Sequence, residues 1–225
     1  MTARVATTSP VAQVRPKGMV GRLFQLMWVI LGVLAAAVVM AAAIEIGGML
    51  AGVWPLDHSY RVLLKEREYI DAIGNFPLTW LSPLSVGVIA ADYVDSAAAT
   101  AIRSTGLEEW MGTIGAYVLA LVNSTKIIIH RAAVCIFVAP GYILVMCVAA
   151  IEGLVYRDIR KYTGAHESSY VFHKAKRWMV PALALTISAY LALPFAVMPV
   201  LVFAPSIALS GFMTYVAAGS FKKFM

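Results

Sequence analysis

The feature that most constrains this chain is a run of 41 residues without a single charged side chain, from Val180 to Ser220. Two more apolar runs precede it: Leu23–Val53 contains only Glu45 as a charge, and Ala132–Val155 contains only Glu152. About 20 mostly apolar residues in a helix cross the core of a bilayer. The first two runs are therefore long enough for one span each, and the third is long enough for two. We predict an all-α integral membrane protein with about four transmembrane helices.

The boundaries follow from these runs and from the prolines inside the last one. Pro194 and Pro199 lie near its middle, where a tight turn between two spans is expected, because proline cannot continue a helix. Composition agrees, since 61% of the residues are hydrophobic and 13% are charged, against roughly 45–50% and 25% in soluble domains. The predicted segments are an arm at 1–22, a first span at 23–53, an extramembrane segment at 54–131, a second span at 132–155, a loop at 156–178, a helical hairpin at 179–220 that turns near 194–199, and a tail at 221–225.

The charges outside these runs predict how the chain is oriented. The first 22 residues hold four basic and no acidic residues, the loop holds six basic against two acidic, and the tail holds Lys222 and Lys223. Segment 54–131 instead holds six basic and eight acidic residues. Basic residues close to spans are retained in the cytoplasm. Both termini and the basic loop are therefore expected inside, with segment 54–131 outside.

Segment 54–131 is expected to be largely helical and to lie against the membrane or against the spans. Tyr60–Ile73 alternates apolar and charged positions as an amphipathic helix does. Ser85–Ser104 is rich in alanine, a strong helix former, and Gly106 is expected to end that helix. We expect residues 107–131 to form an interfacial helix or to run into the second span. The alternative, an additional span, would move the basic loop outside.

Four polar or small residues in the runs are candidates for function or packing. Acids within a membrane mark functional sites by default. Glu45 is placed near the outer interface, and Glu152 lies near the inner end of its span, where an interfacial ion pair, with Arg157 close by, is expected in preference to a role in an ion pathway. Gly48 and Gly52 have the spacing of small residues that lets two helices pack closely.

Neither a catalytic nor a metal site is predicted, and no cofactor is expected. His166, Glu167 and His173 do not have the HExxH spacing of a zinc site, and the chain contains no Walker A, GxGxxG, GxSxG or CxxC motif. Cys135 and Cys147 are twelve residues apart on one predicted helix, about 18 Å, too far for a disulfide within the chain. The apolar run after Leu23 is too long for a signal peptide core of about 7–15 residues, so an anchor that is not cleaved is expected.

The basic loop carries a family resemblance. The stretch Ile151-Glu-Gly-Leu-Val-Tyr-Arg-Asp-Ile-Arg160, then Gly164, Glu167-Ser168 and Tyr170-Val-Phe-His-Lys-Ala-Lys-Arg177, resembles the small membrane proteins of integrating conjugative elements. These proteins are encoded beside the coupling ATPase in conjugative transfer clusters of proteobacteria. The resemblance is specific over residues 151–177. It implies a bacterial inner-membrane accessory protein of a type IV secretion-like DNA-transfer machine, with the coupling ATPase as its partner and segment 54–131 in the periplasm.

The favoured function is a membrane scaffold, not an enzyme, which binds the bilayer and a protein partner through its basic loop and has no sequence-specific contact with nucleic acid. The alternative is a subunit of a homo-oligomeric pore or channel, which glycine- and alanine-rich spans would permit. A transporter is the weakest candidate, because the halves show no repeat. The residues proposed to contact the partner or anionic lipid are Arg157, Arg160, Lys161, His173, Lys174, Lys176 and Arg177.

Overall fold

A computed structural model describes residues 19–72, 82–106, 111–163 and 169–220. Within these ranges the chain forms helices and no strand, which confirms the all-α class for the described part. The side chain of Lys161 and those of residues 169–176 lie outside the description. The helices are α1 (Met19–Leu50), α2 (His58–Ala72), α3 (Pro83–Thr105), α4 (Met111–Tyr162), α5 (Ser169–Ala192) and α6 (Pro199–Gly219).

Three of the described helices are long and apolar enough to cross a membrane. They are α1 over Ile30–Leu50, α4 within Ile114–Arg160, and α6 over Pro199–Gly219. The apolar part of α5, Arg177–Ala192, is shorter, so the fourth predicted span stays a prediction. α5 and α6 are joined by residues 193–198, where the two prolines predicted a turn.

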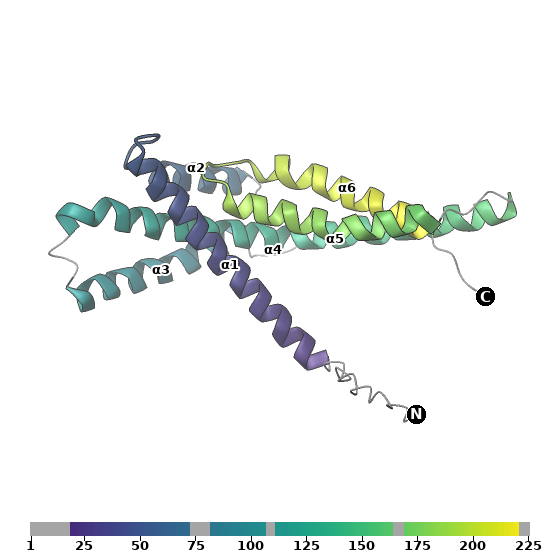
Figure 1. Ribbon diagram of the computed structural model, residues 1–225, viewed down its shortest axis with the longest axis horizontal. Helices are drawn as coiled ribbons and strands as arrows, with labels where there is room; N and C mark the ends of the chain where they lie inside the picture. Colours follow the sequence, from purple (N-terminus) through teal and green to yellow (C-terminus); the bar gives the residue numbers. More distant parts are fainter. Residues whose placement is uncertain (1–18, 73–81, 107–110, 164–168, 221–225) are drawn as a thin grey trace, which may run out of the picture.

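Helix α4 is the longest helix described, and each of the other described helices contacts it. Its 52 residues continue through Pro140 and extend about 78 Å, more than twice the roughly 30 Å thickness of a bilayer core. Figure 1 shows α3 running beside one half of α4 and α5 and α6 beside the other half. Residues 111–131 are thus continuous with the predicted second span. This is one of the two arrangements expected for this segment, a helix that runs into that span. A separate crossing would need a turn that α4 does not contain.

The half of α4 that pairs with α3 is held by polar and small residues. The Lys126 ammonium pairs with the Asp95 carboxylate. Gly87 lies against the buried His130 ring, so that a Cβ at Gly87 would lie 2.8 Å from the ring carbon Cδ2. Ser82 caps the start of α3 in a reciprocal hydrogen-bonded box with Ser85. At the other end, Gly106 has a φ of 68°, so the predicted helix end is confirmed.

Helix α2 buries its apolar side against the chain's own helices. Val62, Leu63 and Ile70 are all buried. Ile70 belongs to a core cluster with residues of α4, α5 and α6. The amphipathic helix predicted at Tyr60–Ile73 therefore forms, and it packs on the bundle.

Helices α4 and α6 approach most closely at glycines that the sequence analysis did not select. A Cβ at Gly153 would lie 2.6 Å from the carbonyl oxygen of Tyr215 and 2.8 Å from Cβ of Ala218. Ala149 and Gly153 have the small-xxx-small spacing on α4.

The predicted packing pair Gly48 and Gly52 is used differently within this chain. Gly48 faces the ring of Trp54, which follows on the same chain. Gly52 lies beyond the end of α1 with a φ of 67° and with open space around its Cα. Gly52 therefore lies in a turn that needs a positive φ, and Gly48 is covered by Trp54. Neither glycine makes a contact between helices of this chain.

Replacing Gly153 by leucine is predicted to push α4 and α6 apart. Overpacking of this kind costs about 1–3 kcal/mol, which lowers the thermal midpoint of a protein of this size by roughly 2–12 °C. Gly32→Leu in α1 is the matched control, because nothing lies within 4 Å of a Cβ there. Thermal unfolding of both variants in the same detergent is the measurement, and equal midpoints would contradict the close approach.

Candidate functional site

The most deeply buried charges form one ion pair between α2 and α4. Nε of Arg131 donates to Oε1 of Glu66 at 3.1 Å, and Nη2 donates to Oε2 at 3.1 Å. The two side chains are 1% and 0% exposed. This two-point geometry matches the fork of a guanidinium to a carboxylate, and it fixes the direction of α2 relative to α4.

The other guanidinium donors of Arg131 bind the turn between α5 and α6. Nη1 donates to the carbonyl oxygens of Tyr190 at 3.0 Å and Leu193 at 2.6 Å, and Nη2 donates to that of Phe195 at 2.8 Å. The last carbonyls of a helix have no partner within it, and a cation there is favoured by the helix dipole. All five N–H donors of Arg131 are thus used.

Tyr190 closes the network. Its hydroxyl donates to Oε1 of Glu66 at 2.9 Å, and its ring lies 5.3 Å from the Arg131 guanidinium carbon. Arg131, Glu66 and Tyr190, which we call the Arg131 network, therefore join α2, α4 and α5. Because every N–H donor of Arg131 is used within the chain, we interpret the network as a structural one that stabilises the packing of these helices.

This network was not predicted from the sequence, although one signal for it was present. Glu66 is one of the charged positions of the amphipathic helix predicted at Tyr60–Ile73. It lies three residues after Leu63 and four before Ile70, which is the spacing of residues on one helix face. An acid on the apolar face of a helix must find a partner when that face is buried. The sequence does not say which basic residue that partner is.

Glu45 is held near the same end of the bundle. Its carboxylate is buried and lies 3.0 Å from Nδ1 of His58. Trp54 stacks on the His58 ring and donates its Nε1 hydrogen to the Glu45 carbonyl oxygen at 3.1 Å. Glu45 and Arg131 line one small cavity, so both polar groups lie where α1, α2 and α4 meet.

The described basic residues at the opposite end of the bundle, where α4 ends, differ in their contacts and in their exposure. Arg160 donates from Nη2 to the Gly219 carbonyl oxygen at 2.8 Å, so it holds the last turn of α6. Arg157 pairs with Asp158 at 3.3 Å, and its side chain is 17% exposed. Arg177 is exposed. The predicted contact residues Lys161, His173, Lys174 and Lys176 have side chains outside the described part, as do residues 164–168 with His166 and Glu167.

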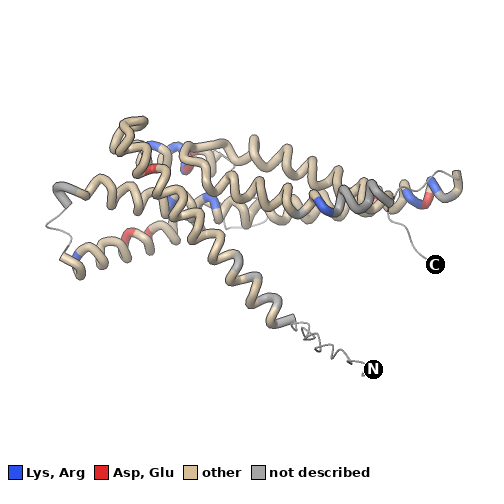
Figure 2. Tube along the Cα trace, viewed as in Figure 1, with Lys and Arg blue, Asp and Glu red and all other residues tan. Residues whose placement is uncertain are grey.

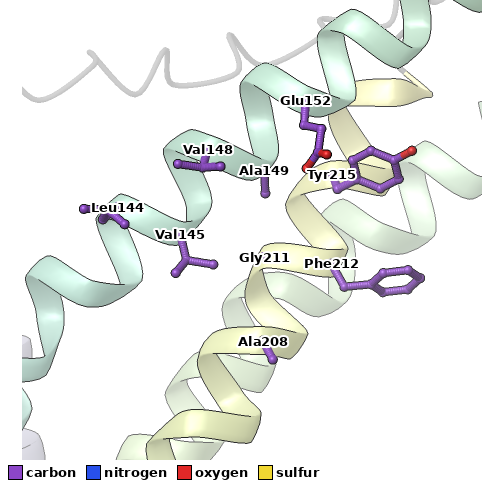
Figure 3. A pocket seen from close by; sticks show the side chains of 9 residues that line it. All are labelled: Leu144, Val145, Val148, Ala149, Glu152, Ala208, Gly211, Phe212 and Tyr215. Carbon is purple, nitrogen blue, oxygen red and sulfur yellow. The ribbon is translucent and has the colours of Figure 1, made fainter.

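Glu152 does not form the expected ion pair with Arg157, because Arg157 pairs with Asp158. Glu152 instead lines an open groove between α4 and α6 with a volume of about 450 Å³. Figure 3 shows its side chain beside the Tyr215 ring, with Ala149 and Val145 further along the same wall. We call this the Glu152 groove; it runs from Leu144 to Glu152 on α4 and from Ala208 to Tyr215 on α6.

Three described helices are long and apolar enough to cross a membrane, and an internal charge network joins the helices, which is consistent with a helical membrane protein. Residues 80–222 match the model of the DtrJ-like family, described as IncC plasmid conjugative DNA transfer protein DtrJ-like. The match covers more than half of the chain, so this protein belongs to the DtrJ-like family of conjugative DNA transfer proteins. No curated protein and no solved structure matches it.

The family match extends the resemblance found in the sequence. That resemblance covered residues 151–177, and the match covers α3 to α6, with Arg131 and Glu152 inside it. A role in conjugative DNA transfer is therefore confirmed. Membership of an integrating element, as opposed to a plasmid, stays a prediction.

Replacing Arg131 by methionine is predicted to destabilise the whole bundle. The change removes the guanidinium donor from three carbonyl oxygens and leaves the buried Glu66 carboxylate with the Tyr190 hydroxyl as its remaining described donor. Removal of one partner of a buried ion pair costs about 3–5 kcal/mol. Thermal unfolding in detergent is the measurement. Lys65→Met is the matched control, because Lys65 is the exposed neighbour of Glu66 and surface changes usually stay within about 0.5 kcal/mol.

Glu66→Gln is expected to cost less than Arg131→Met, because glutamine keeps one oxygen that accepts a hydrogen bond. If Arg131→Met unfolds at the same temperature as Lys65→Met, the network does not hold the helices together.

Proposed function

We propose that this protein is an inner-membrane accessory component of the conjugative DNA-transfer machine, a type IV secretion relative, and that it acts by binding. The observation that carries the proposal is the family match over α3 to α6. Helices of spanning length support a place in the membrane. The family match supports a role in conjugative DNA transfer. The distribution of charge on this chain suggests which of its surfaces contacts a partner.

The basic end of the bundle is the proposed contact with the coupling ATPase. In Figure 2 the charges gather around the α2 and α3 end and at the far end of α4, with an almost uncharged stretch between them. The loop Val155–Trp178 carries six basic and two acidic residues. By the positive-inside rule, this end faces the cytoplasm. A basic surface there would steer an acidic face of a soluble partner towards the membrane.

Arg177 and Arg157 are the residues to test, and Arg160 is not. Arg160 holds the end of α6, so its replacement would disturb the bundle and the surface together. Arg177 is exposed, and Arg157 makes only a pair with its neighbour Asp158. A change at these two positions alters the charge of this end and removes no described hydrogen bond between helices, although the Arg157 side chain is only 17% exposed.

The double variant Arg157→Glu/Arg177→Glu is predicted to reduce co-purification with the coupling ATPase from donor membranes by about tenfold or more, which corresponds to about 1.4 kcal/mol of contact energy. Transfer of DNA to recipient cells is expected to fall in parallel. Lys65→Glu is the matched control, since it reverses one exposed charge at the opposite end of the bundle. Unchanged co-purification and transfer in the double variant would refute a contact through this loop.

A further inference from the structure

We propose that the Glu152 groove is the docking site for a transmembrane helix of a second protein, and that this helix carries a Lys or Arg at the depth of Glu152. The inference goes beyond the proposed contact of the basic loop with the coupling ATPase, because it concerns another surface of the bundle and contact within the membrane.

The carboxylate of Glu152 lacks a partner within the described part of the chain. The two described cations that follow it on α4 are engaged elsewhere: Arg157 with Asp158, and Arg160 with the Gly219 carbonyl oxygen. Glu152 lies inside the predicted second span, Ala132–Val155, three residues before its inner end. Acids within spans are costly and pair with basic residues or with one another. A complementary cation is therefore expected from outside this bundle.

The walls of the groove suit a helix. Small residues, Ala149 on α4 and Ala208 and Gly211 on α6, line it, and small residues let helix backbones approach closely. Phe212 lies at the same groove and is 64% exposed. Figure 3 shows the groove walls formed by apolar side chains, with Glu152 and Tyr215 together. An apolar helix with one basic side chain could pack against the apolar walls and form an ion pair with Glu152.

The apolar runs of a second copy of this chain do not offer the required cation. None of the three apolar runs, Leu23–Val53, Ala132–Val155 and Val180–Ser220, contains a lysine or arginine. Arg131, which borders one of them, uses all its donors within its own bundle. Charge complementarity therefore favours a different protein as the occupant.

Photo-crosslinking in intact donor membranes tests the proposal. A benzophenone amino acid at position 212 is expected to give an adduct that is absent when the same group replaces Leu185. Leu185 is a matched control, because it is a similarly exposed apolar residue of α5, 71% exposed and outside the groove. The crosslinked protein, identified by mass spectrometry, is expected to carry a lysine or arginine within one of its own spans.

The charge requirement is tested in the same membranes. Glu152→Gln keeps the size of the side chain, and we expect it to reduce the adduct at position 212 about fivefold or more, in the range that one polar contact between helices supports. Glu68→Gln, the same change at an exposed acid of α2, is expected to have no effect. Glu152→Lys combined with an acid in place of the partner's cation should restore the adduct.

Three results would overturn the proposal: adducts to lipid alone, adducts to a second copy of this chain, or an adduct whose yield Glu152→Gln leaves unchanged. Equal thermal midpoints for Glu152→Gln and the parent protein would show that loss of the adduct does not come from unfolding. Because these variants leave Arg157 and Arg177 intact, failure here is distinguishable from failure of the coupling ATPase contact.

Discussion

The buried ion pair between Arg131 and Glu66 is the interaction on which the rest of the structure depends. Moving two charges out of water is expensive unless each finds hydrogen-bonding partners. Here the five guanidinium donors are divided between one carboxylate and three carbonyl oxygens. Because these acceptors come from α2, from the end of α5 and from the following turn, one side chain on α4 sets the position of all three.

That constraint gives the molecule two ends with different chemistry. At the α2 end, Glu45 and Glu66 are buried with partners, and polar contacts such as Lys126 with Asp95 hold α3 to α4. At the other end, glycines let α6 lie close to α4, and Arg160 holds the last turn of α6. The buried charges of the first end serve the fold, and other charges there, such as Lys65 and Glu68, are exposed. At the second end Arg177 and Glu152 are exposed, and they are the groups that we propose for contacts with other molecules.

Much of the fold could be predicted from the sequence, because long apolar runs and helix-ending residues act locally. The helical class, the helix around Tyr60–Ile73, the end at Gly106 and the turn after Ala192 all follow from such signals. The Arg131 network could not be predicted, since it joins residues 65 and 59 positions apart. The same holds for Glu152: its sequence neighbour Arg157 suggested a pair, but Asp158 is the group that Arg157 contacts. Gly48 and Gly52 make no contact between helices of this chain, because spacing alone does not say which helix faces which glycine.

We propose that the Arg131 network lies on the periplasmic side of the membrane and the basic loop on the cytoplasmic side. The most direct measurement is labelling of single cysteines by a membrane-impermeant maleimide, in a chain without Cys135 and Cys147. Asp57→Cys, in the exposed turn before α2, is predicted to react in spheroplasts. Tyr162→Cys, at a position 92% exposed at the end of α4, is predicted to react only after the membrane is permeabilised. Labelling of Tyr162→Cys in sealed spheroplasts, with Asp57→Cys protected, would contradict the account.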